Sequence, residues 1–271
     1  MKLSRHLYHT LKQKVINTFK KIKYPLLSNT RKPTRGRKLA LQVIDILTLG
    51  IFRHQNGIET KKDLYNLFVL PCSHKTLVVS LNRFALLVLL LSTRMVSENR
   101  TQSHLVKYTD ATDIPVCLVK NAKRHKTMHG LAAWGKTGKG WFYGLKLHLT
   151  CDCEGRILSF SFTPGNTGDR SQFMKLNKAL TGIFVADGGY LSEKLAREFY
   201  QEGVRILFTK PRANMKKMAT EAQNALYDSR AFIESIFRNL KMFDGLVSSL
   251  PRSIDGYFAN YFYALTARML A

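Results

Sequence analysis

Four polar residues near the C-terminal end of the chain have the types and the spacing needed for phosphate chemistry. This polar quartet consists of Tyr227, Arg230, Glu234 and Lys241, at offsets of 0, 3, 7 and 14 residues. On a single α-helix these positions fall within an arc of roughly 60°. A carboxylate flanked by a phenol and two cations suits a hard metal ion that acts on a phosphodiester, because the cations can contact phosphate oxygens.

Two aspartates could share such a metal ion with Glu234. Asp110 ends a predicted strand, and Asp187 directly follows another. Two Mg²⁺ ions about 4 Å apart, held by carboxylates from different elements, can activate an oxygen nucleophile and stabilise the leaving oxygen. Taken alone, each aspartate is more simply explained as a turn or cap residue. Asp113 and Asp169 are competing candidates because they lie near in the sequence.

The charge of the chain favours a nucleic-acid partner. The sequence has 43 Lys and Arg residues against 18 Asp and Glu, which gives a formal net charge of +25. No acid precedes Asp45, whereas twelve Lys and Arg residues do. Such a field attracts polyanions and releases their counterions on binding. A solvated basic arm and a ribosome-associated protein are the alternatives. A membrane-surface role is disfavoured, because the basic residues are spread over the whole chain.

A further group of cations lies between the two aspartates. Arg124 and Lys126 belong to it, and we predict that they contact DNA. Trp134 and Trp141 follow closely in the sequence. Aromatic rings among cations can stack on exposed bases or pack on a strand edge. For Trp141 we favour packing, and for Trp134 both interpretations stay open.

The periodicity of the sequence changes near residue 100. Before it, apolar spacing predicts short helices within residues 39–52, 64–68 and 73–91. These helices could form a helix-turn-helix-like reader of DNA, or equally a helical packing module. After it, alternation and apolar runs predict strands at 105–109, 141–150, 156–163, 182–186 and 204–208. Helices are predicted at 171–180, at 192–201 and around Glu234.

This order of elements predicts an α/β fold, with a mixed sheet flanked by helices and preceded by an N-terminal helical region. We therefore divide the chain into two predicted domains. Residues 1–100 form a basic helical region expected to bind DNA ends, and residues 101–271 form the catalytic domain.

The sequence contains no segment that we expect to cross a membrane. Its longest apolar run, residues 84–91, is too short for a bilayer. No apolar signal region follows the basic N-terminus. The four cysteines lack zinc-binding spacing and are expected to be reduced thiols. We therefore expect the protein to stay inside the cell.

The ordered motifs resemble those of a known enzyme group. Tyr-x2-Arg-x3-Glu-x6-Lys is the C-terminal signature of transposases related to insertion-sequence family 4, and the polar quartet matches it at all four positions. The surrounding blocks are more specifically similar to the insertion-sequence 982 family of bacterial transposases. These blocks are YTDATDIPVC at 108–117, GWFYGLKLHL at 140–149, TPGN at 163–166 and ADGGY at 186–190.

The resemblance implies a ribonuclease-H-like catalytic core with an Asp, Asp, Glu triad that depends on Mg²⁺ or Mn²⁺, with two ions expected. Carried over by position, it assigns catalysis and metal binding to Asp110, Asp187 and Glu234. It assigns contact with the DNA to the other three members of the polar quartet, Tyr227, Arg230 and Lys241. No organic cofactor is implied.

The resulting hypothesis is a transposase of the bacterial cytoplasm, associated with the nucleoid. It would bind the terminal inverted repeats of an insertion sequence in double-stranded DNA, cut strands there, and transfer the freed 3′ ends into target DNA. A homo-oligomer is expected in the synaptic complex. Two alternatives are a related metal-dependent nuclease that hydrolyses without joining, and a catalytically inactive DNA-binding remnant.

Overall fold

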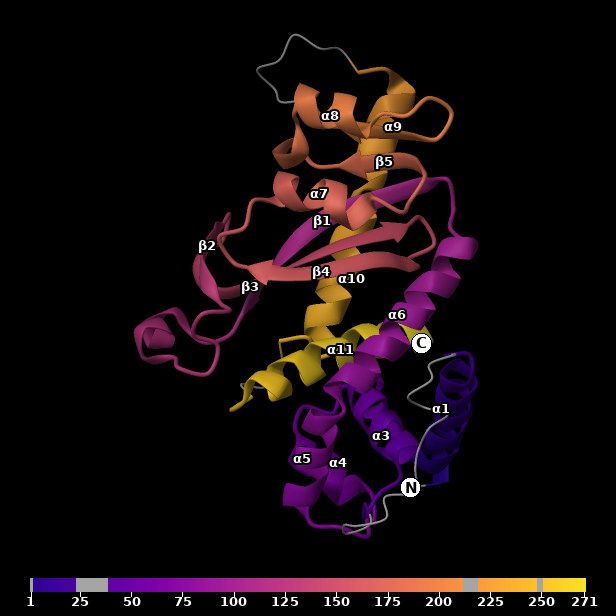
Figure 1. The fold of residues 1–271 in the computed structure, drawn as a ribbon, viewed down its shortest axis with the longest axis vertical. Coiled ribbons are helices and arrows are strands. Elements are labelled where there is room, and N and C mark those ends of the chain that lie inside the picture. Colours follow the sequence, from indigo (N-terminus) through magenta and orange to yellow (C-terminus); the bar gives the residue numbers. More distant parts are fainter. Residues whose placement is uncertain (1, 23–38, 212–218, 248–250) are drawn as a thin grey trace. The chain divides into compact units, whose positions relative to one another are not determined.

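The computed structural model describes residues 2–22, 39–211, 219–247 and 251–271 (Figure 1). The basic residues from 23 to 38, on which part of the charge argument rests, lie outside this part, as do residues 214–216 of the basic stretch after Lys210. The chain forms two compact units. Unit 1 comprises Met1–Met95 with Leu240–Ala271, and unit 2 comprises Val96–Asn239. The functional division at residue 100 stays a prediction.

Unit 2 is built on a six-stranded mixed sheet. Its strands are β1 (Val106–Pro115), β2 (Ala133–Thr137), β3 (Gly140–Asp152), β4 (Ile157–Pro164), β5 (Gly182–Ala186) and β6 (Arg205–Thr209). The spatial order is β2-β3-β1-β5-β6, and β4 pairs with β3. β3 runs antiparallel to β1, β2 and β4, whereas β5 is parallel to both β1 and β6. β1 is therefore the central strand, with an antiparallel neighbour on one side and a parallel neighbour on the other.

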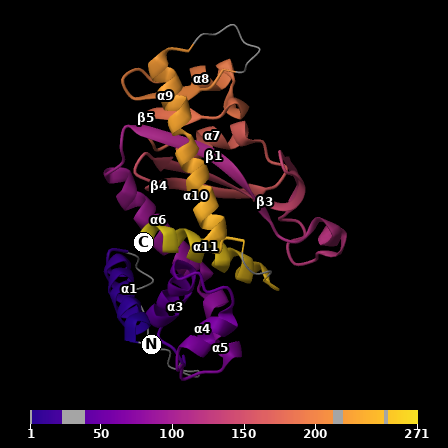
Figure 2. The same cartoon turned by 180° about the vertical axis from the view of Figure 1, so that it is seen from behind.

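Helices cover both faces of this sheet. α7 (Asp169–Asn177) and α8 (Glu193–Phe199) lie on one face, and α9 (Glu221–Ser229) with the start of α10 (Ala231–Met242) on the other (Figures 1 and 2). Beneath α7 and α8 the rings of Phe173, Phe184 and Phe199 pack edge to face, with centroids 4.9 Å apart for Phe173 and Phe199. The predicted mixed sheet flanked by helices is confirmed.

β1 is longer than the sequence predicted. The predicted strand ended at Asp110, but pairing with β3 continues to Pro115, so that Asp110 lies inside the strand opposite Leu149. The polar residues after Asp110 read as a turn, yet the long alternating strand β3 supplies hydrogen-bond partners for them. The short strand β2 was also missed. Its residues pair with the first residues of β3, from Gly140 to Gly144.

The polar quartet does not lie on one unbroken helix, as the spacing argument assumed. α9 ends at Ser229 and α10 begins at Ala231, with Arg230 at the junction. Arg230 keeps helical angles, φ −58° and ψ −26°. Tyr227 therefore belongs to α9, and only Glu234 and Lys241 share α10.

Unit 1 is helical. Its described elements are α1 (Lys2–Lys20), α3 (Val43–Gln55), α4 (Lys61–Leu67), α5 (His74–Arg83), α11 (Ile254–Leu270) and the first part of α6 (Ala85–Thr101). Gly50 on α3 lies against the ring of Tyr263 on α11, and a Cβ at this position would collide with that ring. α1 and α11 were not predicted. The predicted helix at 73–91 is instead split at Phe84 into α5 and α6, which are bent by 49°.

No single helix in the described part of the chain is long and apolar enough to cross a membrane. The bent pair of α5 and α6 meets that measure of length and composition only when its two helices are taken together.

A buried histidine joins three segments of unit 1. Nδ1 of His54 lies 2.6 Å from the carbonyl oxygen of Asp244, and Nε2 lies 3.3 Å from Nη1 of Arg53. A carbonyl oxygen can only accept, so Nδ1 carries the proton and Nε2 accepts from the guanidinium. Arg53 also donates to Oδ1 of Asn260 at 3.1 Å. Burial, followed by the charge of Arg53, lowers the pKa of His54 to about 3. The fold therefore requires a neutral imidazole here.

We predict that His54 makes unit 1 sensitive to acid. The unfolded histidine takes up a proton near its usual pKa of about 6.5, whereas the folded one does not until about pH 3. The contribution of neutral His54 to the stability of unit 1 is therefore fully present above about pH 6.5, and it is lost as the pH falls from there toward about 3. Denaturant titrations at pH 7 and pH 5 should show wild type losing about 2 kcal/mol more than His54→Asn.

The control for this experiment is His9→Asn, which removes an exposed histidine of α1. Asp244 also titrates in this window, because burial raises its pKa to about 6, but both proteins contain it and its effect cancels in the comparison. Equal acid sensitivity of wild type and His54→Asn would contradict the neutral-imidazole argument.

Candidate active site

One guanidinium connects two of the three predicted catalytic acids. Nη1 of Arg230 lies 3.1 Å from Oδ2 of Asp110, and Nη2 lies 2.6 Å from Oε1 of Glu234. The side chains of Asp110 and Arg230 are 18% and 23% exposed, whereas that of Glu234 is 57% exposed. β1 and the α9–α10 junction thus bring together groups that are more than 100 residues apart in the sequence.

The packing of α9 and α10 on β1 fixes this meeting point. Tyr108 is two residues before Asp110, so both side chains lie on the same face of β1. The Tyr108 hydroxyl donates to Oγ of Ser229 at 3.0 Å, and its ring lies 6.3 Å from that of Phe232. These two contacts flank Arg230 along the chain and hold its backbone over Asp110.

Asp187 follows β5, the strand next to β1. Thr109 pairs with Ala186, so the residues that follow them, Asp110 and Asp187, come at the same level of two parallel strands. Oδ1 of Asp187 accepts from the backbone N–H of Gly189 at 2.8 Å and so caps the short helix η2 (Gly188–Tyr190). The charge of Asp187 acts on Asp110, since it contributes to raising the Asp110 pKa.

The environment of Asp110 opposes its ionisation. Burial is the main cause that raises the pKa of this carboxyl to about 7, and the negative charges of Asp187 and Asp169 act in the same direction. The N–H of Ala111, 2.8 Å from Oδ1, and the guanidinium of Arg230 act in the opposite direction. A carboxylate in this position needs a cation beside it to stay charged.

A second charged cluster lies beside the first, around Asp169 at the start of α7. Nζ of Lys146 lies 3.0 Å from Oδ1 of Asp169, and Nδ1 of His148 lies 3.9 Å from the same oxygen. His148 is fully buried and shares a hydrogen bond of 2.8 Å with the hydroxyl of Thr163, while burial lowers its pKa. The charge of Asp169 is therefore already paired with Lys146.

The loop that carries Asp187 is held by α7. Nε of Arg170 donates to the carbonyl oxygen of Gly189 at 2.6 Å. Tyr190, 2% exposed, packs against Phe173. Burial raises the pKa of Tyr190, and so do the nearby charges of Asp110, Asp169 and Asp187. Lys146 and Tyr190 were not predicted as site residues. They lie inside the motif blocks at 140–149 and 186–190, and membership of these blocks is the sequence signal that could have identified them.

Behind Asp110, three buried polar side chains connect β1, β3 and α7. The hydroxyls of Thr109 and Thr150 lie 2.9 Å apart, Thr150 lies 2.7 Å from Oδ1 of Asn177, and Nδ2 of Asn177 lies 3.3 Å from Thr109. All three residues are at most 1% exposed. This closed triangle satisfies its own hydrogen bonds and fixes β1 one residue before the acid.

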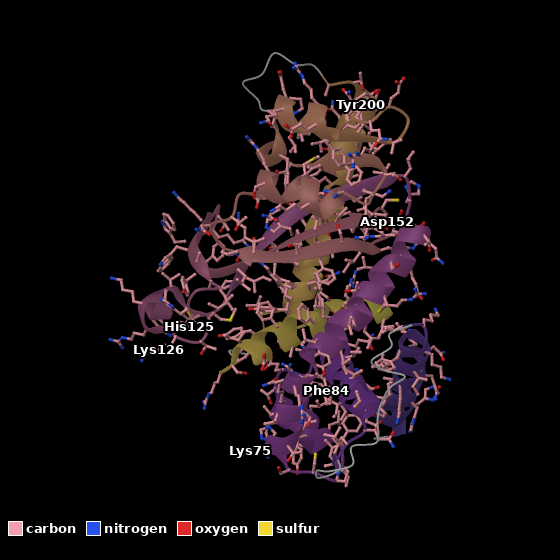
Figure 3. All side chains as sticks on the ribbon, in the orientation of Figure 1. Lys75, Phe84, His125, Lys126, Asp152 and Tyr200 are labelled. Carbon is pink, nitrogen blue, oxygen red and sulfur yellow. The ribbon has the colours of Figure 1, made fainter. Side chains whose placement is uncertain are left out.

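The four other residues predicted to contact DNA are Tyr227, Lys241, Arg124 and Lys126. Tyr227 is 8% exposed, so most of its side chain packs inside unit 2. Lys241 is two helical turns beyond Glu234 on α10, about 10 Å along the axis. Arg124 and Lys126 are exposed at the end of η1 (Val119–Arg124) and in the loop after it, and Figure 3 shows Lys126 extending outward.

The two tryptophans lie on the paired strands β2 and β3. Trp141 is 61% exposed and lies opposite Lys136 of the edge strand β2, with Nζ of Lys136 5.7 Å from the centre of its ring. Trp134 is 41% exposed and lies against Tyr143, with ring centroids 5.6 Å apart.

The three acids supply the donors that Mg²⁺ prefers, because all of their ligand atoms are carboxylate oxygens. Their side chains are not gathered around one point, however. Among the residues that the structure describes, no three His, Cys, Asp or Glu side chains lie close enough to hold one metal ion. Arg230 instead occupies an oxygen of Asp110 and an oxygen of Glu234.

The sequence over this region matches a known family. Residues 100–253, which include Asp110, Asp187 and the whole polar quartet, match the family described as transposase DDE domain. The chain belongs to this family. DDE transposases generally use divalent metal ions, and the family name refers to an Asp, Asp, Glu triad. No curated protein matches the sequence.

The fold of this DDE transposase is similar to that of a solved structure, the cryo-EM structure of the piggyBac transposase synaptic complex with hairpin DNA. The TM-score is 0.50 at 9% sequence identity, and the alignment covers 90% of this chain and 68% of that one. At this identity the likeness concerns the fold alone. It agrees with the ribonuclease-H-like α/β fold expected from the sequence.

We predict that the polar triangle behind Asp110 stabilises unit 2. Asn177→Ala should lower the free energy of unfolding by about 2 kcal/mol, since it leaves buried hydroxyls without a partner and opens a small cavity. Urea denaturation followed by far-ultraviolet circular dichroism measures this change. The matched control is Asn224→Ala at an exposed position of α9, with an expected change within about 0.5 kcal/mol. Similar midpoints for the two variants would rule out a stabilising role for the triangle.

Proposed function

We propose that this DDE transposase binds the inverted repeats at the ends of a bacterial insertion sequence, cuts the DNA there, and transfers the 3′ ends into target DNA. We further propose that the element belongs to the insertion-sequence 982 family, on the motif blocks at 108–117, 140–149, 163–166 and 186–190. The observation that carries the proposal is the meeting of Asp110, Arg230 and Glu234, with Asp187 at the same level of the neighbouring strand.

In this proposal Asp110, Asp187 and Glu234 hold Mg²⁺ or Mn²⁺, two ions per site. When bound, the ions supply a nucleophile from water or a 3′-hydroxyl and stabilise the leaving oxygen. Asp110 and Asp187 come from adjacent parallel strands, and their rigid backbones fix the distance between the two carboxylates. The Glu234 side chain is 57% exposed, so in this proposal a DNA strand would reach it from solvent.

The cations are proposed to hold the DNA. Arg230 and Lys241 would contact phosphates near the acids. Tyr227, on α9, would contact the DNA with the exposed part of its side chain and position the junction that carries Arg230. Arg124 and Lys126 would contact the backbone further along the duplex. Residues 1–100 would bind the terminal repeats, and a homo-oligomer would bring two ends together in the synaptic complex. The protein would act in the bacterial cytoplasm, at the nucleoid.

The test uses a supercoiled plasmid that carries the element ends, together with Asp187→Asn. This variant keeps the shape of the side chain and an oxygen for Gly189, but removes the charge. Both cutting and joining should fall at least about 100-fold, while binding of the ends is unchanged. The control is Asp228→Asn, which neutralises an acid of α9 that is 75% exposed. Substantial cleavage by Asp187→Asn would remove the proposed metal role.

The same assay separates the three candidate functions of the wild-type protein. Joined products support the transposase. Nicks without joined products identify a nuclease, and retained affinity for DNA without either product identifies an inactive remnant.

A second prediction concerns Arg124 and Lys126. If each neutralises one phosphate, the double substitution to Ala should weaken DNA binding to a similar extent on all sequences. It should also reduce the slope of log K against log salt by roughly 2. Fluorescence anisotropy at several salt concentrations measures both quantities. Lys194→Ala, on the exposed surface of α8, is the control. An unchanged slope in the double variant would exclude the phosphate contacts.

A further inference from the structure

The guanidinium of Arg230 lies between two of the acids that are proposed to hold the metal ions. Its two terminal nitrogens contact Oδ2 of Asp110 and Oε1 of Glu234, at 3.1 and 2.6 Å. These two oxygens belong to different elements, and each would be needed by a cation shared between the two acids. A planar guanidinium with donors on both terminal nitrogens is suited to this bridging position.

A divalent cation held by Asp110 and Glu234 would have the same sign of charge as this guanidinium and would draw on the same two carboxylates, in a place where Asp110 and Arg230 are largely shielded from water. Screening between charges is weak in such surroundings, so the two cations would disfavour one another more strongly than on an open surface.

We propose that Arg230 is a clasp that closes the site when DNA and metal are absent, and that it moves from the acids to a DNA phosphate when they bind. In the closed state the single positive charge of the clasp offsets part of the negative charge of Asp110 and Glu234, which would otherwise repel each other and Asp187 more strongly. In the open state the acids are free for the metal, and the guanidinium is free for a phosphate. The inference rests on the proposed metal-dependent function and adds a coupling to it.

The coupling follows from shared use of one side chain. A phosphate that draws Arg230 away frees two metal ligands, and a metal ion that takes the ligands frees Arg230 for the phosphate. DNA should therefore raise the affinity for metal, and metal should raise the affinity for DNA by the same factor, because binding couplings are reciprocal. The exposed side of Glu234 gives both partners access to the clasp.

The test measures Mn²⁺ binding by the full-length protein without DNA, using electron paramagnetic resonance of the free ion. Arg230→Gln removes the competitor and should bind Mn²⁺ about tenfold more tightly than wild type, if the clasp is open for about a tenth of the time. The control is Arg197→Gln, which breaks an exposed ion pair with Glu193 on α8 and should leave Mn²⁺ binding unchanged.

The second arm adds a short DNA duplex. The duplex should tighten Mn²⁺ binding by wild type by a similar factor, and should have little effect on Arg230→Gln. Arg230→Lys serves if the glutamine variant does not fold. Its three donors share one nitrogen, so it should hold the two acids less firmly than the guanidinium and give an intermediate gain. Equal or weaker Mn²⁺ binding by a folded Arg230→Gln would overturn the clasp.

Asp187→Asn separates failure of the clasp from failure of the proposed function. Asp187 takes no part in the contacts of Arg230 described above, so its substitution should weaken Mn²⁺ binding whether or not the clasp exists. If Asp187→Asn binds Mn²⁺ as wild type does, the proposed metal site itself is wrong. If Asp187→Asn loses binding and Arg230→Gln gains none, only the clasp is wrong.

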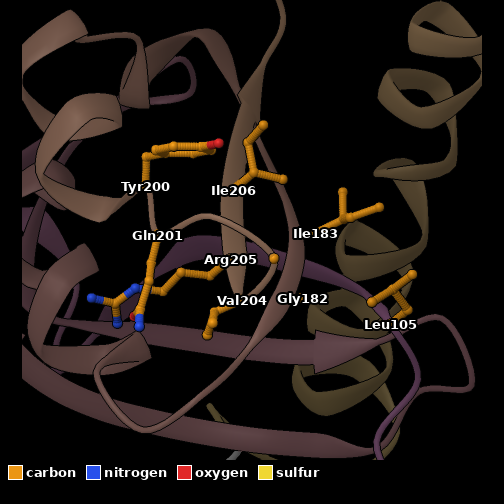
Figure 4. A pocket seen from close by; sticks show the side chains of 9 residues that line it. Leu105, Gly182, Ile183, Tyr200, Gln201, Val204, Arg205 and Ile206 are labelled. Atoms are coloured by element: carbon orange, nitrogen blue, oxygen red, sulfur yellow. The ribbon is translucent and has the colours of Figure 1, made fainter.

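A separate hollow of about 250 Å³ lies at the start of β5 and β6, between Leu105, Tyr200 and Val204 (Figure 4). Asp187 follows the opposite end of β5, roughly 13 Å along the strand. No acid is among the residues that line the hollow, and nothing in the described chain indicates what would occupy it.

Discussion

The candidate site depends on a carboxylate that the fold keeps away from water. Asp110 lies inside the central strand of the sheet, next to a parallel strand that ends in a second acid. Burial raises the pKa of Asp110 to about 7 even with the guanidinium of Arg230 beside it, so the charged form depends on nearby cations. A metal ion would supply a further cation during the proposed reaction. In the clasp that we propose, the site exchanges one cation for the other.

The surrounding elements keep the backbone of this site fixed while its side chains can change partners. On one face of β1, the triangle of Thr109, Thr150 and Asn177 fixes the strand from beneath. On the other face, the Tyr108 hydroxyl holds Ser229. Neither set of contacts includes the carboxylates, so rearranging Arg230 would cost only the ion pairs that it makes. A rigid frame with exchangeable charges is what a site needs when it is empty before its substrate arrives.

The sequence predicted the sheet better than it predicted the helices. β3 alternates apolar and polar residues from Leu145 to Thr150, β4 does so from Leu158 to Thr163, and their hairpin was expected. β1 was predicted too short, since the polar residues after Asp110 resemble a turn until their pairing with β3 is known. α11 went unpredicted because most of its residues are buried on all sides, which removes the amphipathic pattern. Local pattern cannot supply information that lies in the partner strand or the partner helix.

The spacing of the polar quartet predicted only part of its geometry. On a single helix all four residues would share one face, but α9 ends just before Arg230 and α10 begins just after it. The pair formed by Arg230 and Glu234 survives this change, because the i and i+4 relation continues across a junction that keeps helical angles. Tyr227, by contrast, does not share an exposed face with Glu234, because its side chain packs into unit 2.

The contact between Arg230 and Asp110 could not be predicted from the spacing of the quartet, because it requires β1 and the helix junction to pack together. A guanidinium at the junction can reach a strand below it and a helix turn beyond it at the same time. An ammonium group carries its three donors on one nitrogen, whereas the guanidinium presents two separate terminal nitrogens to the two acids, so arginine suits position 230 for a physical reason that the motif alone does not state.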